Sequence, residues 1–315
     1  MGKIVGASIM FDMPQYISIT ADNIFFKNVS NKKEDNVLLK ESTIVEFINN
    51  TSEIDAFSIQ GSQLRISHQI WSGLRKNVRI SLDCENKDVS MLSNFKKLKQ
   101  IYQIRFSFFL NELVSNFETI NKFKKIINDD ELNKYFEYKV IVIYVYKHKL
   151  NNLSKLQTLV KIAFEKGFFV SIFPVPKSIL KSEYILSNEE YRGLSAVVDS
   201  LINKYGRNVY GEFPTMGLIY DNLIGICPSH YIKMNITPEF KLTPCRFVEK
   251  PIGNINNSIK TNWNIWQAEI EKVETHEICK MCSVKKYCNG GCISNWNSNS
   301  KIDTYCIHTS DIVGE

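Results

Sequence analysis

Hydrophobic residues along the first two thirds of the chain alternate between a spacing typical of strands and a spacing typical of helices. Six short segments are rich in Ile, Val, Phe and Tyr, as the strands of a buried parallel sheet are. These strand candidates span residues 16–20, 54–59, 78–82, 101–110, 138–146 and 168–173. A helix is expected after each strand, over residues 41–49, 64–74, 88–98, 113–127, 153–166 and 187–204. The last of these opens with Ser187 three residues before Glu190, the pattern of a capping box.

This alternation predicts an α/β fold, a parallel sheet whose strands are joined by right-handed helical crossovers. Six βα units fit an incomplete (β/α) barrel or an open doubly wound sheet, and their number alone does not choose between the two. The rhythm stops after Gly211, where Asn, Pro and Cys become more frequent. We therefore place a domain boundary near residue 210, between a βα domain over residues 1–210 and a small irregular domain over residues 211–315.

Within the second domain two further elements are expected. Residues 232–237 and 239–242 have the pattern of a short hairpin that ends just before Cys245. Residues 261–271 form an amphipathic helical pattern that leads to the second group of cysteines.

Composition and charge narrow the class of protein. The chain has 315 residues, 44% of them hydrophobic and 23% charged, which is enough to bury a core. The formal charge of +6 comes from Lys and Arg that are spread along the chain, so we expect a solvated basic surface and no nucleic-acid partner. No apolar run reaches the length of a membrane span and the N-terminal segment is unlike a signal peptide, so a cytoplasmic protein without a membrane partner is expected.

Seven of the eight cysteines fall between Cys227 and Cys306. In order they are Cys227, Cys245, Cys279, Cys282, Cys288, Cys292 and Cys306. In a reducing compartment, clustered cysteines favour metal binding over disulfides. Both zinc and iron–sulfur clusters use four thiolates, and a CxxC pair occurs in both kinds of site. A single CxxC followed by cysteines at x5 and x3, with Gly290 and Gly291 before Cys292, favours iron–sulfur and leaves zinc as the alternative.

This cysteine pattern, with its YCNGGC segment, resembles the SPASM domain of radical S-adenosylmethionine enzymes that modify peptides. The resemblance covers residues 220–310 and implies two auxiliary 4Fe–4S clusters. It assigns Cys279, Cys282, Cys288 and Cys306 to the outer cluster, and Cys227, Cys245 and Cys292 to the inner cluster. The inner set has no obvious fourth cysteine, and Asp221 and His230 are the candidate substitutes. Phe240 departs from the family pattern, which often has Gly five residues before the second cysteine.

The resemblance also implies that residues 1–210 form the partial (β/α)6 barrel of the radical enzymes, but this domain lacks the cysteines that the same family uses for radical chemistry. Family members carry CxxxCxxC after the first strand, where three thiolates hold the cluster that binds S-adenosylmethionine. In the matching frame this chain has Asp22, Phe26 and Val29, and no cysteine precedes Cys84. The family's GGEP loop after the second strand corresponds to residues 60–63, which read Gln-Gly-Ser-Gln. Both parts of the cofactor site have therefore lost their chemistry, and we expect no S-adenosylmethionine.

The resemblance as a whole is to the SPASM-domain maturation proteins of grasp-with-spasm systems, which lack the radical motif. It implies an accessory role in the maturation of a ribosomally made peptide. The implied partners are a precursor peptide and an ATP-grasp ligase that forms the bonds. Two alternatives stay open: a redox or radical-type enzyme completed by a partner subunit, and a zinc-stabilised interaction module.

Several other chemically interesting residues are better explained without a functional role. Cys84 lies at a strand end and is expected to be a small buried hydrophobic residue. His276 and His308 flank the cysteines and are expected at the surface. For the tryptophans near the cysteines, Trp263, Trp266 and Trp296, packing in a core and covering of a cluster are equally good explanations.

Overall fold

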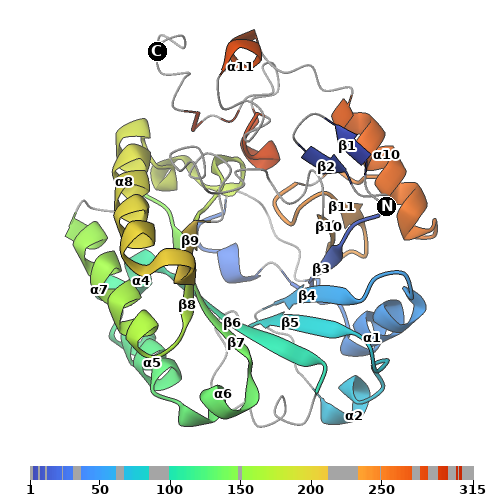
Figure 1. Ribbon diagram of the computed structural model, residues 1–315, viewed down its shortest axis with the longest axis horizontal. Helices are drawn as coiled ribbons and strands as arrows, with labels where there is room; N and C mark the ends of the chain where they lie inside the picture. The colour runs from blue at the N-terminus through green and yellow to red at the C-terminus, as the bar shows by residue number, and fades with distance from the viewer. Residues whose placement is uncertain are drawn as a thin grey trace.

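One curved sheet, covered by helices on its outer side, organises the molecule (Figure 1). The computed structural model describes residues 3–5, 8–10, 13–22, 24–30, 37–61, 67–84, 99–147, 151–211, 233–248, 250–271, 277–282, 290–296, 303, 305 and 306. The expected helix over residues 88–98 lies outside this set, as do the first residues of the helix expected over 64–74.

The central strands follow one another in space in the order in which they occur in the chain, each parallel to the next. They are β3 (Tyr16–Thr20), β4 (Ala56–Gln60), β5 (Arg79–Asp83), β6 (Ile101–Phe109), β7 (Tyr138–Val145) and β8 (Phe169–Pro174). A doubly wound sheet would reverse its strand order at one point, and these six strands do not. The fold is therefore an incomplete (β/α) barrel, one of the two architectures that the sequence allows.

Three further strands extend this sheet at its edges. On one side β9 (Val209–Gly211) pairs with β8 in parallel. On the other side β10 (Lys233–Ile236) pairs with β3 in parallel and with β11 (Leu242–Thr243) in antiparallel fashion. The hairpin expected before Cys245 is thus confirmed, and it is built directly onto the first barrel strand. A separate hairpin is formed by β1 (Lys3–Val5) and β2 (Ser8–Met10).

The helices follow the strands as the hydrophobic pattern predicts, with several shorter elements added. The α-helices are α1 (Glu41–Asn50), α2 (His68–Trp71), α4 (Leu110–Ser115), α5 (Phe117–Ile127), α6 (Asp130–Tyr135), α7 (Asn151–Glu165), α8 (Asn188–Tyr205), α10 (Ile259–Glu271) and α11 (Glu277–Met281). The short 3-10 helices are η1 (Ile24–Phe26), η3 (Lys177–Ile179), η4 (Ser182–Tyr184), η5 (Gly206–Asn208) and η7 (Ile293–Asn295). The capping box at the start of α8 is confirmed: Ser187 and Glu190 each accept a hydrogen bond from the other's backbone N–H.

The expectation of one helix over residues 113–127 is wrong. The structure has two helices here, because Asn116 adopts an extended conformation between α4 and α5. Its side chain accepts a hydrogen bond from the backbone N–H of Thr119 at 3.1 Å and so caps the second helix. Asn favours such a cap over a helix interior.

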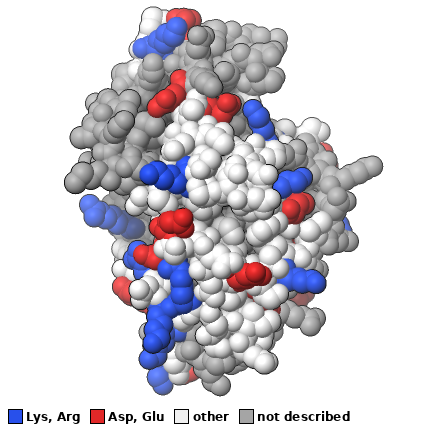
Figure 2. Space-filling model, turned by 90° about the vertical axis from the view of Figure 1, so that its right-hand side faces the viewer, with Lys and Arg blue, Asp and Glu red and all other residues white. Residues whose placement is uncertain are grey.

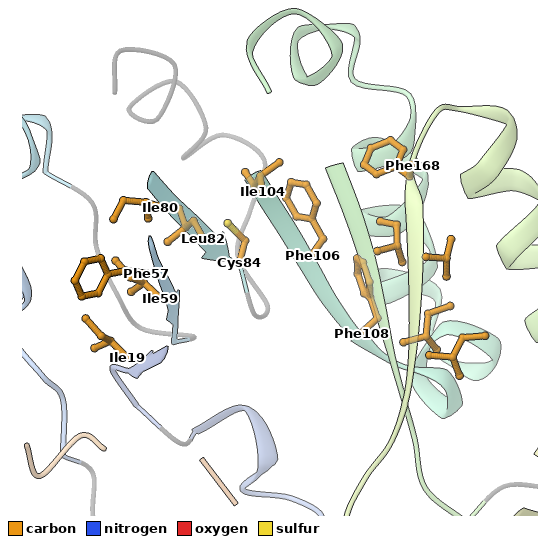
Figure 3. Close-up of a cluster of buried hydrophobic side chains, with 14 of the residues drawn as sticks. Ile19, Phe57, Ile59, Ile80, Leu82, Cys84, Ile104, Phe106, Phe108 and Phe168 are labelled. Carbon is orange, nitrogen blue, oxygen red and sulfur yellow. The ribbon is translucent and has the colours of Figure 1, made fainter. Parts of the chain in front are cut away.

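The main core lies between the outer face of the sheet and the helices. Alternate strand residues such as Ile19, Ile59 and Leu82 are at most 1% exposed there. Cys84 belongs to this core and lies among aliphatic and aromatic side chains (Figure 3), as expected for a structural residue. Trp263 of α10 is fully buried in the same core, and Trp266 packs against it.

The surface carries charges of both signs. On the face in Figure 2, acidic and basic side chains are interspersed with uncharged residues, and several basic side chains gather toward one lower edge. No helix in the described part of the chain is both long and apolar enough to cross a bilayer.

Candidate functional site

The segment after β3, where family members place their cluster ligands, is packed into the inside of the barrel. Phe26 and Val29 are 3% and 4% exposed, and Asp22 is fully buried. The Phe25 ring stacks on Phe109 of β6, with 4.5 Å between the ring centroids. The Phe26 ring meets Tyr144 of β7 edge-on at 5.1 Å. A carboxylate, an aromatic ring and an aliphatic side chain therefore stand in the frame of the CxxxCxxC motif, at Asp22, Phe26 and Val29, and all three are buried.

These rings belong to a second apolar cluster, which we call the lumen cluster. Its buried members are Phe25, Phe26, Val29, Phe109, Val140, Val142, Tyr144, Val175, Ile179, Leu180 and Phe247. Val142 and Tyr144 alternate along β7 with Ile141 and Ile143, which point to the main core. Because successive strand residues face opposite sides, the lumen cluster lies on the inner side of the curved sheet.

The segment that follows β3 also crosses the mouth of the barrel. The backbone N–H of Lys181 donates to the Val29 carbonyl at 3.0 Å, and Ser30 forms an isolated bridge with Leu180. Residues 180 and 181 follow η3, which comes after β8. The loop after β3 is therefore joined to the loop after β8, across the strand ends where (β/α) barrels carry their active sites.

The first two residues of the segment that corresponds to the GGEP loop, Gln60 and Gly61, pack against the end of β3. Ala21 N–H donates to the Gln60 carbonyl at 2.7 Å, which holds the ends of β3 and β4 together. A Cβ atom on Gly61 would lie 2.8 Å from the Asp22 Oδ2 atom and 2.9 Å from the Ala21 Cβ atom. Gly61 therefore packs directly against Asp22 and Ala21, and only glycine fits there without displacement. Ser62 and Gln63 lie outside the described residues.

The inner face of the barrel also has a polar half that our sequence analysis missed. Thr20 donates to Asn235 Oδ1 at 3.0 Å, and Ser107 donates to Asp83 Oδ1 at 2.7 Å. Asp83 is 2% exposed, and the Arg105 guanidinium lies 3.9 Å from its other oxygen. Polar residues alternate with apolar ones in the strand segments YISIT and FSIQ, and this alternation could have predicted the polar side chains on the inner face.

The structure brings two of the expected cluster ligands into one helical turn. Cys279 lies in α11, and the backbone N–H of Cys282 donates to the Cys279 carbonyl at 3.3 Å. A turn of this kind presents the two thiols of a CxxC pair from adjacent backbone. Cys245 follows β11 and packs against the lumen cluster, so it lies at the barrel side of the C-terminal region.

Cys292 is held by a buried carboxylate. Its backbone N–H donates to Asp303 Oδ2 at 2.9 Å, and Tyr305 N–H donates to the other carboxylate oxygen at 2.9 Å. Gly291 has a φ of 82°, and a Cβ atom there would lie 2.4 Å from the Asp303 Cβ atom. Burial raises the pKa of Asp303 to about 6. The glycine pair therefore lets the backbone before Cys292 wrap closely around this carboxylate.

Contacts from the barrel reach the same carboxylate region. The Lys177 ammonium lies 4.1 Å from the centroid of the Tyr305 ring, which in turn stacks on Tyr191 of α8 at 4.3 Å. Burial lowers the pKa of Lys177, while the Asp303 carboxylate opposes that shift. The backbone N–H of Lys177 donates to Asn295 Oδ1 at 2.8 Å. These contacts fix the Cys292 loop against the end of the barrel.

Complete cysteine cages are not visible in the described residues. Among them, no three His, Cys, Asp or Glu side chains lie close enough together to hold a metal ion. Cys227 and Cys288 lie outside the described set, as do Asp221, His230, His276 and His308. The assignment of ligands to two clusters therefore stays a prediction.

Trp296 donates its indole N–H to the Gly290 carbonyl at 2.9 Å and so supports the glycine pair.

The architecture is that of a TIM-barrel-like partial (β/α) barrel. Neither the models of protein families nor the curated proteins give a match to this sequence. Among solved structures, Streptococcus suis SuiB bound to S-adenosylmethionine matches with a TM-score of 0.68 and 16% identity, over 95% of this chain and 78% of SuiB. SuiB bound to its precursor peptide SuiA matches with a TM-score of 0.66 and 15% identity, over 95% of this chain and 77% of SuiB. The chain therefore shares the fold of SuiB.

Proposed function

We propose that this chain is a non-radical accessory protein in the maturation of a ribosomally made peptide. Its barrel serves as a scaffold and its C-terminal region binds iron–sulfur clusters. The observation that carries the proposal is the burial of Phe26 and Val29 in the lumen cluster, in the frame where a radical enzyme needs thiolates. Neither side chain is able to ligate iron, and both are in contact with apolar neighbours.

The C-terminal cysteines carry the second part of the proposal. Cys279, Cys282, Cys288 and Cys306 would hold one 4Fe–4S cluster, and Cys227, Cys245 and Cys292 would hold the other. The chemistry of the donor set fits, because the thiols of Cys279 and Cys282, presented from one turn at the end of α11, and a glycine pair before Cys292 suit a bulky cluster. Such clusters, when bound, act as structural staples or electron carriers. Either role suits a protein that supports a bond-forming partner.

The proposed partners are a ribosomal precursor peptide and an ATP-grasp ligase. Support for the peptide is the likeness to SuiB, whose structures include one with a precursor peptide. The ligase rests on the resemblance of the cysteine pattern to grasp-with-spasm proteins. Because the barrel mouth is filled by the chain's own side chains, we place bond formation on the ligase.

The catalytic part of the proposal is tested by incubating the reduced protein with S-adenosylmethionine under anaerobic conditions. We expect no 5′-deoxyadenosine above a protein-free control. Turnover by the isolated chain would overturn the accessory role and favour a radical enzyme. The partner part is tested by co-purification with the tagged ligase and precursor from the same gene neighbourhood. If neither binds at micromolar concentration, the accessory role is wrong.

The cluster part is tested by single substitutions read out as iron per chain. Cys282→Ala is expected to lose about half of the bound iron, because it removes a ligand from one of two clusters. Cys84→Ala is the matched control: Cys84 is buried in the main core, and iron content per folded chain is expected to stay at the wild-type value. Equal iron in both variants would contradict the ligand assignment.

A further inference from the structure

The C-terminal hairpin that precedes Cys245 is joined to the barrel through buried side chains as well as through the sheet. β10 pairs with β3 so that Asn235 lies beside Ser18. Asn235 accepts a hydrogen bond from Thr20 at 3.0 Å and donates to Thr243 Oγ1 at 3.2 Å. Thr243 in turn donates to the Cys245 carbonyl at 3.0 Å. Three side chains that are at most 1% exposed thus connect β3 to the backbone of Cys245.

The next residue, Arg246, makes a second connection between the same regions. Its Nη1 atom donates a hydrogen bond to Gln60 Oε1 at the end of β4. Its guanidinium carbon lies 4.9 Å from the centroid of the Phe26 ring and 5.6 Å from that of Phe247. Arginine suits this position because its planar guanidinium stacks on an aromatic face while its edge donates hydrogen bonds.

Both barrel partners of Arg246 stand at altered positions of the former cofactor site. Phe26 lies where the second thiolate of CxxxCxxC would be, and Gln60 opens the segment in the place of the GGEP loop. We infer that Arg246 is a positioning residue that ties the Cys245 loop to this closed barrel mouth. The former cofactor site then has a new structural role, which is to fix one thiol of the C-terminal cage from nearly two hundred residues upstream in the chain.

This inference goes beyond the accessory role, because it concerns how the barrel and the cysteine region act on each other. It is tested on metal-free protein by the rate at which maleimide labels Cys245, followed by peptide mass spectrometry. Cys282, which directly follows α11, is the internal control, because it is a partly exposed thiol and no hydrogen bond or ring contact joins it to Arg246 or Gln60 in the described residues. Arg79→Met is the matched variant, since Arg79 also lies over an aromatic ring, that of Tyr102 at 5.9 Å.

We expect Arg246→Met and Gln60→Met each to speed Cys245 labelling about tenfold, the factor that corresponds to one lost hydrogen bond from a charged donor. The double variant is expected to add little to either single one, because both remove the same contact. Gln60→Glu in an Arg246→Lys background is expected to restore slow labelling through an ion pair. Arg79→Met is expected to leave both rates unchanged.

The inference is overturned if Cys245 labelling is unchanged in Arg246→Met, or if Cys282 labelling rises by the same factor. The first result would show that Arg246 does not hold the loop, and the second would show general loosening of the fold. Because no metal is present in this assay, its outcome is independent of whether the cage binds iron, zinc or neither. A failure of the proposed function is therefore distinguishable from a failure of this inference.

Discussion

Truncation of Phe26 is the change that most directly disturbs the closed barrel mouth. Its ring lies 5.1 Å from the Tyr144 ring, 5.7 Å from that of Phe109 and 5.6 Å from that of Phe247, measured between centroids. Truncating a buried Phe to Ala costs about 3–5 kcal/mol of unfolding free energy. Because several aromatic contacts are lost together with the cation–π contact of Arg246, we expect about 4 kcal/mol for Phe26→Ala.

The assay is urea denaturation followed by circular dichroism, with equal slopes checked for each variant. Phe117→Ala is the matched control, because Phe117 is 78% exposed and its truncation is expected to change stability by at most about 0.5 kcal/mol. Phe26→Leu, which keeps most of the apolar volume, is expected to fall between the two. If Phe26→Ala costs no more than Phe117→Ala, the ring does not fill the barrel mouth and the reasoning fails.

Three further predictions concern backbone conformation. Phe240 has a φ of 58° and packs edge-on against Phe47. Because glycine adopts this conformation more easily than alanine, Phe240→Gly is expected to be more stable than Phe240→Ala by about 1 kcal/mol in urea denaturation. The usual order, with the Ala variant more stable, would refute this. Gly291→Ala is expected to lower the free energy of unfolding by at least about 3 kcal/mol, because Gly291 has a positive φ and the added Cβ atom would clash with Asp303. An unchanged midpoint of thermal melting would contradict this prediction. Ser187→Ala removes the capping box of α8 and is expected to cost about 1 kcal/mol, with Ser187→Asn retaining the cap; equal losses in both variants would count against the cap.

Local hydrophobic periodicity was enough to predict most of the barrel. The six central strands are apolar segments rich in β-branched and aromatic residues. The helices α1, α7 and α8 each bury one face. The buried residues of α1 are Ile44, Val45 and Ile48, at the spacing that the helical pattern requires. These elements were predictable because the spacing of apolar residues within one segment indicates which face of the element is buried.

Features that depend on one residue or on distant pairing were not predictable in the same way. The break at Asn116 interrupts a helical pattern that continues on both sides, and only the capping role of Asn marks it. The pairing of β10 with β3 joins segments about two hundred residues apart, and the short β10 carries no signal for its partner. Strand order was likewise left open, because the number of βα units does not fix it.

The candidate site was half predictable. The sequence identified positions 22, 26 and 29 as lacking thiolates, since that needs only a frame and residue types. That Phe109 and Tyr144 from β6 and β7 would meet Phe26 inside the barrel depends on the register of neighbouring strands, which no local pattern encodes. Phe240, which stands where the family pattern often has Gly, has a φ of 58°, in the left-handed region that glycine adopts most easily.

We propose that the C-terminal cysteines hold two clusters while the barrel holds none. The most direct test is the content of iron, acid-labile sulfide and zinc per chain after anaerobic purification and cluster reconstitution. We expect about eight iron and eight sulfide per chain, as two 4Fe–4S clusters require, and no zinc. Zinc without sulfide would contradict the iron–sulfur assignment, and about twelve iron per chain would contradict the closed barrel.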